Sequence, residues 1–279
     1  MPLLSIIMAT KNEDILYLEK CLESISLQSF QDYNFNIIID SFDDSNFDYL
    51  QRICDQNDKI KLLNNSKNPG VASSRNFGIM NSSSKYISII DSDDYYEKDK
   101  LAFQVEFLER HEEISLVGSN IFLVNDENKI IGERLYPEFD NKIKKEFLFK
   151  MPIANSSLVV RRQDLLDVGL FDENYNKAED LELWLRFLSK EKKMHNIQKK
   201  LVYYRSPENE NMKRGREHYR NYYTAIKKQG KNIWPLHLRI ISLSMFYIIQ
   251  LIPNYFLSFL LSTSIVHKIK NIRSFNGIE

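Results

Sequence analysis

Acidic and hydroxyl side chains stand directly after three apolar segments of the sequence. Thr10 follows the segment 3–9, Asp40 follows 35–39, and the run Asp91-Ser92-Asp93-Asp94 follows 86–90. If these segments are neighbouring parallel strands, their carboxyl ends meet at one edge of a sheet, where open α/β sheets bind ligands. Crowded carboxylates raise one another's pKa, and a divalent cation relieves that cost. Because the available ligands are oxygens, the edge predicts a site for Mg²⁺ or Mn²⁺ that also receives phosphate groups.

The run 91–94 has two other interpretations. A calcium loop of the EF-hand type needs Gly at its sixth position and Glu at its twelfth. Counted from Asp91, those positions hold Tyr96 and Ala102, so this pattern fails. The acids could also simply begin a helix, because the helix dipole favours negative charge there. The apolar strand before them and the two other polar strand ends favour the cation site.

Strands and helices that would position these residues alternate along the segment 3–110. The predicted strands are 3–9, 35–39, 59–63 and 86–90; helices follow them, the last from 97 to 110. We expect Asn12 to be the N-cap of the first helix, with Glu13 and Asp14 in its first turn. Continuous apolar strands are typical of a parallel sheet covered by helices on both faces. Further along, 115–124 and 129–135 predict a hairpin, 158–160 a strand and 180–188 a helix.

Length and composition indicate a globular protein with one main domain. The chain has 279 residues, of which 43% are hydrophobic and 27% are charged. Its net charge is zero, so no overall field attracts nucleic acid, and we expect no such partner. Cys21 and Cys54 lie in apolar helical stripes, which predicts core residues in a reducing compartment. The segment 3–9 lacks the basic flank of a signal peptide, which favours a cytoplasmic protein.

Several segments resemble, in order along the chain, those of one large enzyme family. They are 4–12 (LSIIMATKN), 28–30 (QSF) with 36–40 (NIIID), 68–76 (NPGVASSRN), 86–94 (YISIIDSDD), and 168–172 (VGLFD) with 178–186 (AEDLELWLR). Together they resemble the family 2 glycosyltransferases, an inverting group with the GT-A fold. The resemblance implies a GT-A α/β/α sandwich with a mostly parallel central sheet, followed by a helical C-terminal tail. The resemblance covers about residues 3–190, and it rests on the order of all these segments together.

The resemblance also implies a role for individual residues at the donor. It places the nucleotide sugar at Thr10, Asp40, Arg75, Asp91 and Ser92. Asp93 would be the main ligand of Mn²⁺ or Mg²⁺, with Asp91 beside it. The cation would neutralise charge on the leaving diphosphate. Taken alone, Arg75 could equally be a surface arginine on a helix.

On the acceptor side, the resemblance implies a general base at the start of the last predicted helix. Asp180 would take the proton of the acceptor hydroxyl, and Glu179 is the alternative base. An acidic helix start without any catalytic role is the competing interpretation. Trp184 would form a wall on which a sugar stacks, or be a core residue. Asn155 would donate a hydrogen bond to a phosphate or a sugar.

The sequence departs from the family pattern at two places. The family usually has a second acid and then a glycine after the position of Asp40, whereas this chain has Ser41 and Phe42. Asp43 and Asp44 could compensate through a shifted register. The family often has a histidine before the acceptor-side strand, where this chain has Ala154 and Asn155.

The C-terminal part changes character, and we expect a catalytic domain over 1–228 and a helical tail over 229–279. Residues 240–266 contain no Asp, Glu, Lys or Arg, but Pro253 and Asn254 lie in their middle. Two shorter helices broken at Pro253 are expected, lying on the inner face of the cell membrane through 236–273. Lys268, Lys270 and Arg273 would suit anionic headgroups. Packing against the catalytic domain, an oligomer contact and a true membrane span are the alternatives.

These expectations combine into one predicted function. The chain would move a hexose from a nucleotide-diphosphate sugar, most simply a UDP-sugar, to a hydroxyl of a glycan or a lipid-linked saccharide. Polysaccharide, O-antigen or capsule biosynthesis is the setting that the resemblance implies. A nucleotidyltransferase that makes sugar nucleotides is one alternative, but the segment 10–14 has none of the glycines that a triphosphate loop needs. A non-catalytic subunit that binds nucleotide sugars is the other.

Overall fold

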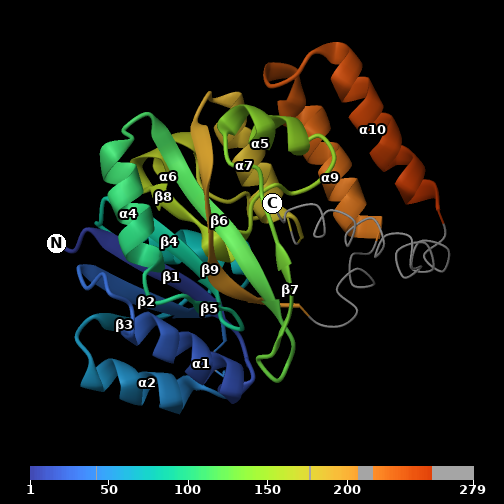
Figure 1. Ribbon diagram of the computed structural model, residues 1–279. Coiled ribbons are helices and arrows are strands. Elements are labelled where there is room, and N and C mark those ends of the chain that lie inside the picture. The colour runs from blue at the N-terminus through green and yellow to red at the C-terminus, as the bar shows by residue number, and fades with distance from the viewer. Residues whose placement is uncertain (42, 176, 207–215, 253–279) are drawn as a thin grey trace.

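One mixed β-sheet forms the centre of the protein in a computed structural model, which describes residues 1–41, 43–175, 177–206 and 216–252 (Figure 1). The strand order within this part is β3-β2-β1-β4-β8-β6-β9-β5, with β7 paired to β6. The strands are β1 (Leu4–Thr10), β2 (Tyr33–Ile39), β3 (Ile60–Asn64), β4 (Tyr86–Asp91), β5 (Tyr95–Tyr96), β6 (Ile114–Val124), β7 (Ile130–Arg134), β8 (Val159–Arg161) and β9 (Lys193–Arg205). The α-helices are α1 (Ile15–Ser26), α2 (Phe47–Gln56), α3 (Val71–Met80), α4 (Lys100–Arg110), α5 (Asp140–Glu146), α6 (Arg162–Val168), α7 (Glu179–Ser189), α9 (Arg216–Gln229) and α10 (Leu236–Leu251). Two 3₁₀ turns complete the set, η1 (Asn155–Ser157) and η2 (Gly230–Asn232).

The parallel half of the sheet confirms the expected α/β architecture. Strands β3, β2, β1 and β4 pair in parallel, and their side chains alternate between two buried cores. Ile6 and Met8 face the core that contains Leu18 of α1, while Ile7 faces the core that contains Ile79 of α3. Because both faces are covered, a strand of this sheet carries apolar residues without alternation.

The other half of the sheet is mixed. The predicted hairpin is confirmed, since β6 and β7 pair antiparallel. β8 lies antiparallel between β4 and β6, and β9 runs parallel to β6. The sequence analysis did not predict β9, whose register against β6 shifts several times and whose pattern is therefore irregular.

Three details of the sequence analysis were wrong. Asn12 is not the N-cap of the first helix, because Asp14 accepts the N–H of Leu16 at 2.8 Å and α1 begins at Ile15. Asn12 instead adopts a left-handed backbone with φ of 48°. Cys54 is only half-buried, and the helix expected from residue 97 begins at Lys100.

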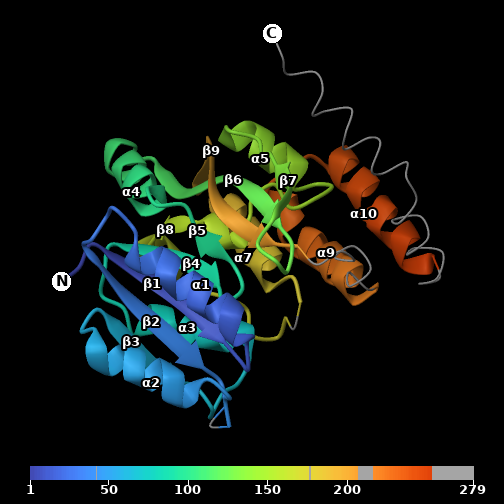
Figure 2. The same ribbon diagram turned by 60° about the horizontal axis from the view of Figure 1, so that its bottom comes forward.

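The helices α9 and α10 lie side by side at one end of the molecule (Figures 1 and 2). Trp234 and Phe246 belong to the same buried core as Trp184 of α7. Trp234 also donates its indole N–H to the carbonyl of Lys144 at 3.0 Å. Residues on both sides of position 228 therefore share one core, and the proposed boundary there stays a prediction.

The tail agrees with the sequence expectation as far as it is described. Helix α10 ends at Leu251, shortly before Pro253, as expected for a helix interrupted by proline. The second helix expected after Pro253 lies outside the described residues. Among the helices that are described, none combines the length and the apolar character that crossing a bilayer requires.

Helix α3 approaches the sheet closely because residue 78 is glycine. A Cβ atom at Gly78 would lie 2.6 Å from Cδ1 of Ile38 and 2.8 Å from Cγ2 of Ile7. These contacts are with fully buried side chains of β2 and β1, which have no space into which they could move. The glycine therefore sets the height of α3, and of Arg75 upon it, above the sheet.

We expect Gly78→Ala to destabilise the protein by about 1–2 kcal/mol, because overpacking costs more than the gain in helix propensity. Urea unfolding followed by circular dichroism measures this difference. Gly132→Ala is the matched control, since its Cβ would lie 3.6 Å from Cδ1 of Leu123 in ordinary contact. If the Gly78→Ala variant were at least as stable as the wild type, α3 would not depend on this close approach.

Candidate active site

The three polar strand ends lie together, as the sequence predicted. In the parallel register, Thr10 of β1 is opposite Ile39 of β2, and Ala9 is opposite Asp91 of β4. Asp40 follows directly on β2, so it reaches the same edge. This edge of the sheet is where the chemistry was expected.

The loop of residues 91–94 is held by two segments that are distant in the sequence. Asp91 receives a hydrogen bond from the hydroxyl of Ser156 at 3.1 Å, and its own N–H donates to that hydroxyl at 3.2 Å. Asp94 accepts the backbone N–H of Arg205 at 2.8 Å. The guanidinium of Arg205 donates to the carbonyl of Asp93 at 3.1 Å. The loop is thus pinned by η1 on one side and by the end of β9 on the other.

The acids of this loop have perturbed protonation. Burial, followed by the charges of Asp91 and Glu13, raises the pKa of Asp93 to about 7. Burial and the neighbouring Asp93 raise the pKa of Asp94 well above its usual range. Ser92 donates its hydroxyl to Glu13 at 2.7 Å, so Glu13 is also part of the cluster. The electrostatic cost of this crowding is what a bound divalent cation would relieve.

The donor set fits a hard cation in its chemistry. Asp91, Asp93 and Glu13 offer carboxylate oxygens, and one oxygen of Asp94 is buried without a hydrogen-bond partner. Among the residues that the structure describes, no three His, Cys, Asp or Glu side chains are already gathered around a single cation position. A phosphate-bearing substrate commonly supplies the remaining ligands of Mg²⁺, so a partial protein site is the expected form.

Arg75 joins the two acidic segments of the site. One terminal nitrogen donates to Asp91 and the other to Glu179, each at 2.7 Å, and the side chain is buried. Burial lowers the pKa of Arg75, but these two carboxylates outweigh it and raise the pKa above its usual value. The guanidinium also lies over the ring of Phe171, 5.5 Å from its centre. Because both ends engage protein carboxylates, a direct contact with the nucleotide stays a prediction.

Asp180 stands at the start of α7 next to Glu179. The preceding residue, Ala178, has a left-handed backbone with φ of 59°, and the turn there presents both acids towards Arg75. Burial, followed by the charge of Glu179, raises the pKa of Asp180 to about 7, while Arg75 opposes the rise. A carboxylate with a pKa near the operating pH is suited to general-base catalysis.

Thr10 and Asp40 each have a buried oxygen without a hydrogen-bond partner. The hydroxyl of Thr10 is buried and makes no hydrogen bond. Asp40 accepts the N–H of Gly70 at 3.1 Å through one oxygen, while its other oxygen is buried without a hydrogen bond and lies 3.5 Å from Nζ of Lys11. Gly70 has φ of 135°, a conformation that favours glycine.

Asp44 does not compensate for the missing second acid after Asp40. Its two oxygens accept the N–H groups of Asn12 and Asn46, each at 2.9 Å, and the residue is buried. Both oxygens are used to hold the loops that follow β1 and β2. The expectation that Asp44 replaces the missing acid through a shifted register is therefore wrong. Asp43 is exposed, and its role stays a prediction.

On the acceptor side, the stacking role predicted for Trp184 is wrong, whereas the role of Asn155 stays a prediction. Trp184 is fully buried and packs edge to face against Phe171 and Phe187, with ring centres 6.3 and 5.3 Å away. It has no exposed face for a sugar, so the stacking wall was wrong and the core interpretation is confirmed. Asn155 begins η1, next to the Ser156 that holds Asp91, and both polar atoms of its side chain are buried without a partner.

Sequence reasoning missed three residues of this site: Glu13, Ser156 and Arg205. Glu13 looked like part of a helix start, and nothing in the neighbourhood of the other two marked them. Arg205 is the last residue of β9, and its guanidinium also reaches the carbonyl of Asn125 at 2.7 Å and Oδ1 of Asn128 at 2.6 Å. Only the pairing of β9 with β6 and β5 brings it to the loop.

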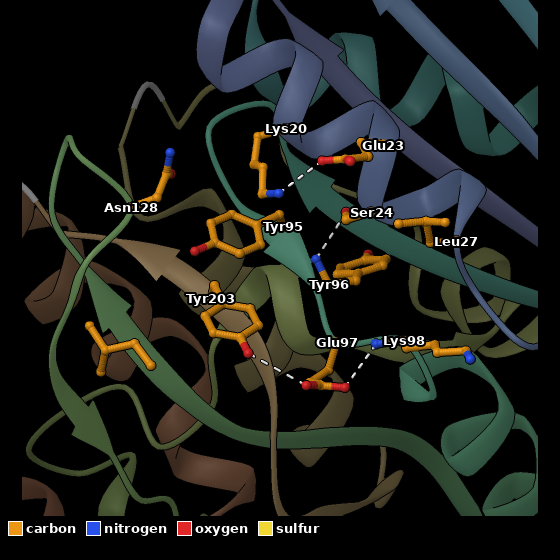
Figure 3. Close-up of a pocket in the computed structure, with 11 residues that line it drawn as sticks. Lys20, Glu23, Ser24, Leu27, Tyr95, Tyr96, Glu97, Lys98, Asn128 and Tyr203 are labelled. Carbon is orange, nitrogen blue, oxygen red and sulfur yellow. Dashed lines mark hydrogen bonds and ion pairs between the residues drawn. The ribbon is translucent and has the colours of Figure 1, made fainter.

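A separate groove of about 510 Å³ lies between α1, β5 and the β6–β7 hairpin (Figure 3). The rings of Tyr95 and Tyr203 stack in it at 4.5 Å, and Lys20 lies over Tyr95 at 5.7 Å. None of the predicted site residues lines this groove. The groove is therefore distinct from the acidic edge.

Comparisons with known proteins identify the family and the fold. The family described as Glycosyl transferase family 2 matches residues 5–169. The Escherichia coli UDP-Glc:alpha-D-GlcNAc-diphosphoundecaprenol beta-1,3-glucosyltransferase WfaP is 31% identical over 206 residues, which is 74% of this chain and 78% of that one.

Two solved structures share the fold. Staphylococcus aureus TarS 1-349 in complex with UDP gives a TM-score of 0.65 at 17% identity and covers 96% of this chain and 78% of its own. The mannosyltransferase PcManGT from Pyrobaculum calidifontis, in complex with GDP-Man and Mn²⁺, gives a TM-score of 0.66 at 15% identity and covers 92% of this chain and 72% of its own. With the family match over more than half of its length and this GT-A fold, the chain belongs to glycosyl transferase family 2 and is a glycosyltransferase.

Proposed function

We propose that this glycosyltransferase moves a hexose from a UDP-sugar to a hydroxyl of a glycan or a lipid-linked saccharide, with inversion at the anomeric carbon. The observation that carries the proposal is the bridge of Arg75 between Asp91 and Glu179. It joins the loop 91–94, where the donor is predicted to bind, to the start of α7, which carries the predicted base Asp180 next to Glu179. In an inverting transfer, the leaving diphosphate and the base that activates the acceptor lie on opposite sides of the anomeric carbon.

The donor side is supported by the free polar atoms at the strand ends. Thr10 and Asp40 would bind the nucleoside, because each has a buried oxygen without a hydrogen-bond partner. WfaP is named for UDP-Glc as its donor, and TarS was solved with UDP, which favours a uridine nucleotide here. Ser92 would hold Glu13 in place through the hydrogen bond that its hydroxyl donates.

Asp93 and Asp91 would hold Mn²⁺ or Mg²⁺, the former being the ion bound in PcManGT. When bound, the cation would supply Lewis-acid stabilisation of the diphosphate that leaves. Ser156, Arg205 and Arg75 keep the loop in one position, so the carboxylates need not reorganise as charge develops.

Asp180 would remove the proton from the acceptor hydroxyl as its oxygen attacks the anomeric carbon. The bond from that carbon to the diphosphate oxygen breaks in the same step, and the nucleoside diphosphate leaves. Glu179 is committed to Arg75 at 2.7 Å, which favours Asp180 over Glu179 as the base. Asn155 would donate to the acceptor or to a phosphate, because its amide has no protein partner.

The setting would be the assembly of a surface polysaccharide such as O-antigen or capsule, since the name of WfaP includes a diphosphoundecaprenol acceptor. Residues 1–228 would form the catalytic domain and 229–279 the tail, in a cytoplasmic protein at the inner face of the membrane. The two alternatives make different predictions. A nucleotidyltransferase would release pyrophosphate. A binding subunit would bind nucleotide sugars equally well when Asp180 is replaced.

Replacing Asp93 by Asn removes one carboxylate charge and keeps the size of the side chain. From a panel of UDP-sugars, we expect the wild type to release UDP from one donor when Mn²⁺ is present. The rate for Asp93→Asn should fall by at least about 10²-fold. Asp58→Asn, an exposed acid before β3, is the control and should leave the rate unchanged. Equal release by both variants, or UDP binding that ignores Mn²⁺, would contradict the role of Asp93.

Asp180 must be ionised to act as a base, so the transfer rate should rise with pH through about 7. The measurement is kcat/KM against pH at saturating Mn²⁺, because the bound cation keeps Asp93 ionised. We expect Asp180→Asn to lower kcat/KM by about 10²–10⁴-fold. A residual rate close to that of the wild type would leave the non-catalytic alternative standing.

The neighbours of Asp180 should move this pH profile in opposite directions. Arg75 lowers the pKa of Asp180, so Arg75→Gln should shift the midpoint upward. Glu179 raises that pKa, so Glu179→Gln should shift the midpoint downward while the protein stays active. If Glu179→Gln instead abolishes transfer and Asp180→Asn does not, Glu179 is the base.

A further inference from the structure

Helix α10 exposes apolar side chains along its outer face. We call them the outer stripe: Leu236, Ile240, Ile241, Tyr247, Ile248 and Leu251, each between 54% and 64% exposed. Their spacing of three, four and seven residues places them on one side of the helix. The opposite side is occupied, since Phe246 stacks on Tyr222 of α9 at 4.4 Å and Ser242 donates to the carbonyl of Leu148.

The outer stripe lies at the edge of the molecule. Figures 1 and 2 both show α10 beside α9 and away from the central sheet. A helix with one face on the core normally shows polar side chains on the other face. An apolar face of this size at the surface therefore indicates a contact with another apolar phase or molecule.

The charged residues in the last part of the sequence are mostly positive. Glu217 and Glu279 are the only acids from position 217 onward, and the charged residues between them are Arg220, Lys227, Lys228, Lys231, Arg239, Lys268, Lys270 and Arg273. The whole chain is neutral, so the acids are concentrated before this region. Lys227 and Lys231 are exposed at the junction of α9, η2 and α10, whereas Lys228 between them lies 3.5 Å from Asp172 and 3.8 Å from Glu182. The partner of the outer stripe should therefore be both apolar and negatively charged.

We propose that the outer stripe lies on the surface of a lipid bilayer that contains anionic phospholipids. Sixteen residues form a helix too short to span the bilayer, so α10 would lie in the interface with its axis along the surface. Tyr247 suits the headgroup level, and the exposed lysines would meet the phosphates. The inference deepens the proposed location at the inner face of the membrane by assigning the contact to one helix face, and its use in reaching a lipid-linked acceptor rests on the proposed function.

Two other occupants of the stripe match the charges less well. A symmetric dimer through α10 would bring the lysines of one copy towards those of the other, because the same patch meets itself. The chain's own segment 253–279 carries Lys268, Lys270 and Arg273 and has no acid before Glu279, so it offers the lysines no opposite charge. An anionic bilayer satisfies both the apolar stripe and the basic cluster.

The test uses the full chain and the double variant Ile241→Glu with Ile248→Glu. Co-sedimentation with vesicles of phosphatidylcholine containing phosphatidylglycerol measures binding, and vesicles of phosphatidylcholine alone provide the comparison. We expect the wild type to bind the anionic vesicles, more weakly at high salt, and the double variant to bind at least about tenfold less. Ile131→Glu with Leu135→Glu, at residues exposed by 54% and 60% on another surface, should bind like the wild type.

Three results would overturn the proposal. The double variant could bind anionic vesicles as tightly as the wild type, or the wild type could bind neutral vesicles equally well. Without vesicles, the double variant could also sediment at a lower mass than the wild type, which would show that a second copy covers the stripe. UDP release by both variants in vesicle-free solution should match the wild type. Because that assay needs no membrane, failure of the transfer reaction and failure of vesicle binding are separate outcomes.

Discussion

The site depends on one buried guanidinium that lies between acidic segments. Arg75 contacts Asp91 at the end of β4 and Glu179 at the start of α7, both at 2.7 Å. Without a positive charge between them, the carboxylates of the two segments would repel each other in a poorly solvated place. Arg75 thereby pairs with Glu179, while burial and the charge of Glu179 raise the pKa of the neighbouring Asp180 to about 7. Two adjacent acids on one helix thus have different surroundings, because only Glu179 forms an ion pair with the arginine.

The position of that arginine is set by backbone packing. Gly78 lets α3 lie directly against Ile7 and Ile38. Gly70 forms the turn that leads into this helix, and its N–H donates a hydrogen bond to Asp40. The turn before α3 therefore contacts the strand end at β2, while Arg75, further along the helix, reaches β4. Helix α3 connects three parts of the edge, so a change in its packing would shift both the loop 91–94 and the acids at the start of α7.

The other contacts that hold the loop 91–94 come from residues late in the chain. Ser156 of η1 and Arg205 of β9 hold Asp91, Asp93 and Asp94 by hydrogen bonds. Beyond β9, α9 and α10 pack on α7 through the core that contains Trp184, Trp234 and Phe246. The helix that begins with Glu179 and Asp180 is therefore covered by the tail that presents the outer stripe. The proposed membrane surface and the proposed base belong to one packed body.

The sequence by itself determined the parallel α/β half, the polar strand ends and the family, because apolar runs, turns and strand exits are local patterns. It also placed the acids 91–94 and 179–180 at the ends of elements, where the structure finds them. Tertiary structure alone decided that Asp14 rather than Asn12 caps α1, that Trp184 is a core residue, and that Asp44 serves the backbone. It also decided the partners of Arg75, Ser156 and Arg205. These contacts join residues far apart in the sequence, and their energies depend on burial and geometry that no local pattern contains.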